Sequence, residues 1–61
     1  MTSITISKSG FIFKVKIEPN VCAVFLEGSQ HPIKKDDTIQ KANRHKIINW
    51  AENSINEYLL P

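Results

Sequence analysis

The chain has 61 residues, of which 41% are hydrophobic and 23% charged, and its formal net charge is +2. This ordinary composition argues against wholesale disorder, and the length allows one small domain, residues 1–61. The net charge is too small to indicate nucleic-acid binding unless the basic residues are concentrated on one surface. No apolar run approaches the roughly 20 residues of a membrane span, so we expect no membrane partner.

Two strands are predicted first along the chain. Residues 3–7 alternate polar and apolar, with Ile4 and Ile6 on one face. Lys8, Ser9 and Gly10 then form a predicted three-residue hairpin loop. The clearest strand spans residues 11–17, where four apolar residues face one way and Ile12, Lys14 and Lys16 the other. Pro19 and Asn20 predict a turn after it.

A third strand, residues 21–27, is apolar on both faces. Such a run is typical of a strand that is buried on both sides. Short connections favour an antiparallel meander with the second strand in the centre, which leaves the third strand at an edge. An apolar edge strand invites pairing with another chain.

The C-terminal part predicts one long helix, residues 38–60, with Asp37 as N-cap and Gln40 in the capping-box position. Its apolar face contains Ile47, Ile48, Ala51, Ile55, Tyr58 and Leu59. Ile39 and Ala42 are out of register with that face. The alternative is therefore a short turn followed by a second helix start, capped by Asn43. We favour the single long helix, with residues 38–42 its uncertain part.

The expected fold is thus α+β, with a three-stranded antiparallel β-meander and one long C-terminal α-helix packed on one face. One helix covers only one face of a sheet, so Ile12 and half of the third strand stay exposed. We therefore expect a homodimer, formed through the third-strand edge or the open face. The alternative is a monomer with a partly exposed sheet.

Basic residues are concentrated around the predicted start of the helix. This cluster is the strongest indication of a functional surface in the sequence. Cations at a helix N-terminus oppose the helix dipole, by about 0.3–1 kcal/mol per charge, so local stability does not explain them. They suit an anionic protein surface or phosphate, unless they form only a solvated face. The predicted partner-contacting residues combine this cluster with Trp50 and the third strand: Lys34, Lys35, Lys41, Arg44, Lys46, Trp50, Val24 and Leu26.

Catalysis finds little support in the sequence. Cys22 is the one cysteine and lies among apolar neighbours, while His31 and His45 are the only histidines. Asp36 and Asp37 are better explained as loop and cap residues, and no glycine-rich phosphate loop is present. We expect no catalytic residues, no cofactor, no metal, no small-molecule substrate and no enzymatic activity. A single thiol without a disulfide partner fits a cytoplasmic location.

The order of the elements resembles that of HicB-type antitoxin domains over about half of the chain. The helix begins with Asp37-Thr38-Ile39 and ends with Ala51-Glu52 and Glu57-Tyr58-Leu59. Residues 43–50 would be an insertion, and KKDD replaces the glycine-rich segment that the family has before its helix. The resemblance implies an antitoxin-like regulatory role.

The functional hypothesis is a non-catalytic binding protein that modulates or inhibits a macromolecular partner, most simply a protein. Free-standing chains of this size often come from phages or mobile elements. The alternative is a small nucleic-acid-binding or antitoxin-like protein. Its basic residues would be Lys14, Lys16, Lys34, Lys35, Lys41, Arg44 and Lys46.

Overall fold

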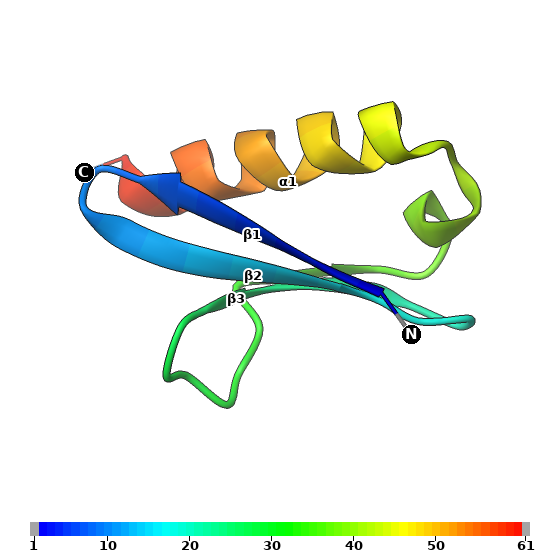
Figure 1. Ribbon diagram of the computed structural model, residues 1–61, viewed down its shortest axis with the longest axis horizontal. Coiled ribbons are helices and arrows are strands. Elements are labelled where there is room, and N and C mark those ends of the chain that lie inside the picture. Colours follow the sequence, from blue (N-terminus) through cyan, green and yellow to red (C-terminus); the bar gives the residue numbers. More distant parts are fainter. Residues whose placement is uncertain (1, 61) are drawn as a thin grey trace.

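A computed structural model describes residues 2–60. Four strands come first, β1 (Thr2–Lys8), β2 (Phe11–Ile17), β3 (Cys22–Leu26) and β4 (Lys34–Asp36). A short 3₁₀ helix, η1 (Ile39–Lys41), leads into the C-terminal helix α1 (Arg44–Leu59). The strands form one antiparallel sheet in the order β1-β2-β3-β4, with α1 across one face (Figure 1). The α+β prediction is confirmed, but the sheet has four strands, not three.

The β1–β2 hairpin closes through a two-residue turn, not the predicted three-residue loop. Ser9 and Gly10 both have positive φ, 54° and 81°. Two consecutive positive φ values are typical of the type I′ turn, whose twist matches that of the strands it joins. Lys8 therefore still belongs to β1, where it pairs with Phe11.

Strand β4 corrects the prediction that β3 is an edge. Val24 pairs with Lys34 and Cys22 with Asp36, and the Ile33 amide donates to the Val24 carbonyl at 2.8 Å. Three charged residues have no intrinsic preference for a strand, so pairing with β3 produces this element. Within residues 2–60 the two edges of the sheet are therefore β1 and β4.

The core lies between α1 and one face of the sheet. It consists of Phe13 and Val15 from β2, Cys22 and Val24 from β3, and Ile47, Ala51 and Ile55 from α1. Alternation along the strands places the sheet residues on one face, and the spacing of 47, 51 and 55 places the helical residues on one stripe.

The helical apolar face is narrower than predicted. Ile48 is only half-buried, because it lies about 100° around the helix from Ile47. Tyr58 is 50% exposed, with its ring edge-on to Phe13 at 6.1 Å. Ser54, which is not part of the predicted apolar face, is buried, whereas Ile48 and Tyr58 are not. The Ser54 hydroxyl donates to the Trp50 carbonyl at 2.9 Å.

The prediction of one long helix from residue 38 is wrong, and the alternative start at Asn43 is what the structure contains. Ala42 is extended, with ψ 170°, which ends η1. The Asn43 side chain then accepts a hydrogen bond from the Lys46 amide at 3.0 Å and caps α1. The change of direction lets Ile39 pack against the core, which a continuous helix would prevent.

Asp36, not Asp37, supports the first turn of this segment. One carboxylate oxygen of Asp36 accepts hydrogen bonds from the Thr38 amide at 2.7 Å, the Thr38 hydroxyl at 2.7 Å and the Ile39 amide at 2.9 Å. Gln40 donates its side-chain amide to the Asp37 carbonyl at 2.8 Å. The predicted capping box is therefore replaced by an aspartate turn one residue earlier.

Candidate functional site

The face of the sheet that α1 leaves uncovered carries the candidate site, and we call it the open face. Strand register defines its members, because residues directly opposite one another point to the same side. One row across the sheet is Ser3, Lys16, Ala23 and Lys35, and the next is Thr5, Lys14 and Phe25. Three lysines from two strands thus share one face with a single aromatic ring.

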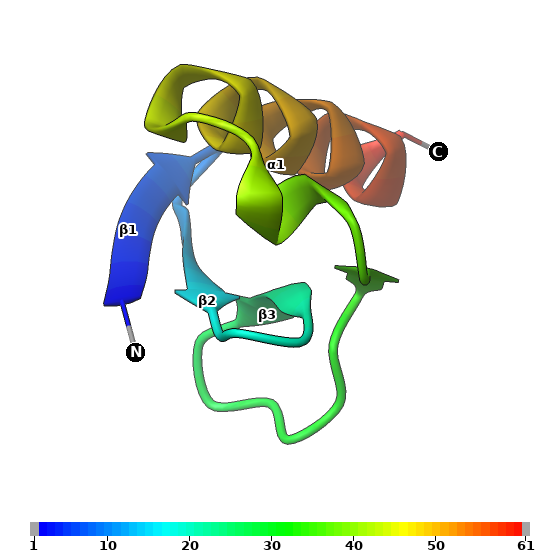
Figure 2. The ribbon, with the colours of Figure 1, turned by 90° about the vertical axis from the view of Figure 1, so that its right-hand side faces the viewer.

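A loop turns this flat face into a recess. Gly28 has a φ of 89°, a value that favours glycine. The loop that joins β3 to β4 lies below the sheet, on the side opposite α1 (Figures 1 and 2). The Ser29 hydroxyl donates to the His31 carbonyl at 3.2 Å and accepts from the His31 amide at 3.3 Å. These two hydrogen bonds stabilise the conformation of the loop between Ser29 and His31.

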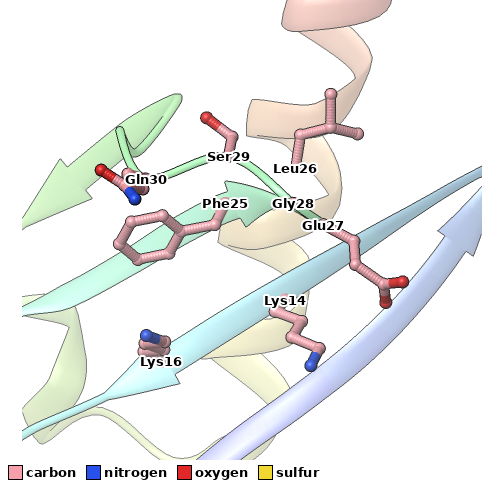
Figure 3. Close-up of a pocket in the computed structure, with 8 residues that line it drawn as sticks. All are labelled: Lys14, Lys16, Phe25, Leu26, Glu27, Gly28, Ser29 and Gln30. Atoms are coloured by element: carbon pink, nitrogen blue, oxygen red, sulfur yellow. The ribbon is translucent and has the colours of Figure 1, made fainter.

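The recess has a volume of about 410 Å³. Its lining comes from β2, the end of β3 and the loop, namely Lys14, Lys16, Phe25, Leu26, Glu27, Gly28, Ser29 and Gln30. Figure 3 shows the Phe25 ring between the loop and the two lysines of β2. The recess therefore offers two cations, one aromatic face and one carboxylate to a ligand.

Lys16 and Phe25 form the most specific contact of the site. The Lys16 ammonium lies 5.0 Å from the centroid of the Phe25 ring. A cation at this distance over an aromatic face is attracted by about 0.5–1 kcal/mol at an exposed site. Phe25 is only partly buried, so part of the ring remains available to a flat ligand group.

The structure divides the predicted basic cluster between the two faces of the molecule. Lys34 and Lys35 are neighbours on β4, so they point to opposite sides, and only Lys35 lies on the open face. Lys41, Arg44 and Lys46 are exposed around the start of α1, on the helix side of the sheet. The predicted basic residues Lys34, Lys35, Lys41, Arg44 and Lys46 therefore do not form one surface.

The predicted apolar contact residues lie mostly in the interior. Val24 is fully buried beneath α1, so its side chain has no surface to offer a partner. Leu26 and Trp50 are partly buried and pack against the core. The aromatic residue that does reach the open face is Phe25, which the sequence indicated only as part of an apolar strand.

Two ionisable groups near β4 have shifted pKa values. Burial of Cys22, and secondarily the nearby Asp36 carboxylate, raise the pKa of its thiol. The Thr38 hydroxyl, followed by the Thr38 and Ile39 amides, lowers the pKa of Asp36. A buried thiol with a raised pKa is a poor nucleophile, and Asp36 is occupied as a local cap. Both shifts are thus structural in origin.

A second recess of about 400 Å³ lies beside β4 and is lined by Val21, Lys35, Asp36 and Asp37. Lys35 thus borders this recess as well as the open face.

Within residues 2–60, no three histidine, cysteine or acidic side chains are grouped to hold a metal ion. In that same part of the chain, no helix is long and apolar enough to cross a membrane.

Comparison with protein families, with curated proteins and with solved structures found no match to this chain. The resemblance to HicB-type antitoxin domains therefore rests on element order and a few helix residues alone. The functional argument depends on the geometry of the open face.

Proposed function

We propose that this chain is a non-catalytic binding protein whose open face binds single-stranded nucleic acid. The observation that carries the proposal is the register that places Lys14, Lys16 and Lys35 on the same face as Phe25, opposite α1, with Lys14 and Lys16 lining the recess beside the ring. Cations that follow a backbone, together with an aromatic ring for stacking, are the two components of single-strand binding.

Charge alone does not distinguish the two sides of the molecule. The open face carries three lysines, but Lys41, Arg44 and Lys46 lie on the helix side together with Glu52 and Glu57. What distinguishes the open face is the Phe25 ring beside Lys14 and Lys16. A single strand is therefore expected to bind where cations and an aromatic ring lie together.

The expected affinity follows from the number of phosphate contacts. Each neutralised phosphate on a single strand contributes about −0.7 to the slope of log K against log salt. Three lysines therefore predict a slope of about −2. Binding without sequence preference is expected with a Kd on the order of 10⁻⁴–10⁻⁶ M at physiological salt.

Fluorescence anisotropy of a labelled 12-nucleotide strand, as DNA and as RNA, tests the proposal at several salt concentrations. Lys16→Gln is expected to weaken binding and reduce the salt slope by about 0.7. Lys46→Gln is the matched control, because it removes the same charge at the start of α1. Phe25→Leu is expected to weaken binding about fivefold or more, with Phe25→Tyr retaining affinity.

Two outcomes would refute the proposal. The first is no binding at about 100 μM protein in low salt. The second is equal loss of affinity in Lys16→Gln and Lys46→Gln, since that would mean diffuse attraction rather than a site on the open face.

A second candidate function, binding of a protein partner, is favoured by exposed apolar residues at the hairpin end of the molecule. Phe11 is 49% exposed, Tyr58 50% and Leu60 69%. Tyr58, near the end of α1, contacts Phe13 of β2, and in Figure 1 the end of α1 and the β1–β2 hairpin lie toward the same end of the long axis. Aromatic residues are enriched among the hot spots of protein interfaces.

Site-specific photocrosslinking in producing cells tests this second function. A crosslinker at position 11 is expected to give a discrete adduct that a crosslinker at the exposed Asn53 does not. Adducts of equal yield from both positions, or adducts with chaperones alone, would contradict it.

A further inference from the structure

Strand β1 leaves one complete edge of the sheet open. It is a seven-residue strand, and within residues 2–60 its backbone pairs only with β2. It has no proline and no bulge, and its one charged residue, Lys8, lies at its end. Charge, proline and bulges are the devices that protect an edge strand from pairing, and β1 lacks them over its central part.

The opposite edge is protected. Strand β4 has three residues, Lys34, Lys35 and Asp36, and all of them are charged. A short charged edge strand discourages the addition of another strand. The two edges therefore differ in kind, and only β1 is suited to pairing.

The hairpin geometry shows which backbone groups of β1 point outward. In a two-residue hairpin the residues that flank the turn, Lys8 and Phe11, exchange hydrogen bonds, and bonded and non-bonded pairs then alternate along the ladder. The backbone groups of Ile4 and Ile6 therefore point to β2. Those of Ser3, Thr5 and Ser7 point away from the sheet.

We propose that a second copy of this chain pairs antiparallel along β1, with Thr5 opposite Thr5 of the other copy. In this register Ser3 faces Ser7 of the second copy, so residues whose backbone groups point outward meet one another and can form hydrogen bonds. Ile4 faces Ile6 of the second copy. About six inter-chain hydrogen bonds result, and no like charges face each other. Ile4 and Ile6 are only half-buried at this edge, and the pairing covers them with the same residues from the other copy.

The pairing has a consequence for the open face. A two-fold axis midway between the two Thr5 residues joins two four-stranded sheets into one sheet of four plus four, that is eight, strands, with both helices on the same side. The open faces of the two copies then become continuous, and their lysines lie on one surface. The role of this continuous surface in binding rests on the proposed function, whereas the pairing itself does not.

Charge substitution at the two-fold axis gives a direct test. Because Thr5 faces itself, Thr5→Lys and Thr5→Glu each place like charges opposite one another. Sedimentation or light scattering at about 100 μM, without nucleic acid, is expected to show the native chain at about twice its 7.0 kDa mass and each variant as a monomer. An equimolar mixture of the two variants is expected to restore the dimer through opposite charges.

Asn53→Lys and Asn53→Glu, on the exposed surface of α1, are the controls and are expected to leave the mass unchanged. Circular dichroism of each variant separates loss of the dimer from loss of the fold. A monomeric native chain would overturn the pairing, and so would a dimer that persists in both Thr5 variants. A native monomer that still binds nucleic acid would leave the proposed function intact.

Discussion

Replacing Ile55 with valine probes the packing of α1 on the sheet with the smallest possible change. Ile55 is fully buried, so the lost methylene costs about 0.8 kcal/mol in transfer free energy. The small cavity adds a further amount, for a total of about 1.2 kcal/mol. Unfolding entropy for 61 residues is about 0.13 kcal/mol/K, so the expected drop in Tm is about 9 °C.

Ile48→Val is the matched control for this change. It makes the same substitution in the interior of the same helix, so the difference in helix propensity cancels. Ile48 is only half-buried, and it is not among the side chains that pack against the core. We expect its cost to stay below about 0.5 kcal/mol, or about 4 °C in Tm.

Thermal unfolding followed by circular dichroism, at one protein concentration for all variants, measures both shifts. The sequence pattern treats Ile48 and Ile55 as equivalent members of one apolar face. A shift for Ile48→Val that equals or exceeds that for Ile55→Val would therefore refute the orientation of α1 described above.

Three further predictions concern the start of α1 and the groups near β4. Asn43→Ala is expected to cost about 1 kcal/mol in unfolding free energy by urea titration, because it removes the cap on the Lys46 amide, while Asn43→Asp retains it. The lowered pKa of Asp36 contributes stability above the ordinary aspartate value of about 3.9 that is lost as the pH falls through the lower folded-state value. Acid titration of Asp36→Asn is therefore expected to show a shallower loss of stability below about pH 4, and an unchanged profile would contradict this role. Cys22 is expected to react with Ellman's reagent at neutral pH far more slowly in the native protein than in denaturant, because the thiol is buried and its pKa is raised; equal rates would place it at the surface.

The strands could be predicted from the sequence because their signal is local. Alternation with a period of two places Phe13 and Val15 on the buried face and leaves Lys14 and Lys16 on the other. Strand β4 could not be predicted in this way. Its residues, KKD, have no strand preference, and their pairing with Cys22, Ala23 and Val24 depends on the path of a loop.

The residue at which the helix begins was difficult to predict from the sequence for a different reason. Asp36, Asp37 and Asn43 are all competent caps, and the sequence alone does not choose among them. The choice depends on tertiary packing, since Ile39 reaches the core only when the chain changes direction at residues 42 and 43. The prediction of one continuous helix gave local propensity more weight than this contact.

The candidate site was only partly predictable. Lys14 and Lys16 were recognisable as exposed residues of β2, but the sequence suggested that they extend a basic cluster on the helix. Strand register instead pairs them with Phe25 and Ala23, and it brings Lys35 to the same face. A shift of one residue in that register would move all of these side chains to the opposite face.

Chemical-shift mapping tests the open face as the binding surface most directly. Amide signals of ¹⁵N-labelled protein are followed while an unlabelled 12-nucleotide single strand is added at low salt. We expect the largest changes at Lys14, Lys16 and Phe25 and in the loop of residues 27–30, with little change at residues 44–46. Changes centred on residues 44–46, or none at any position, would contradict binding by the open face.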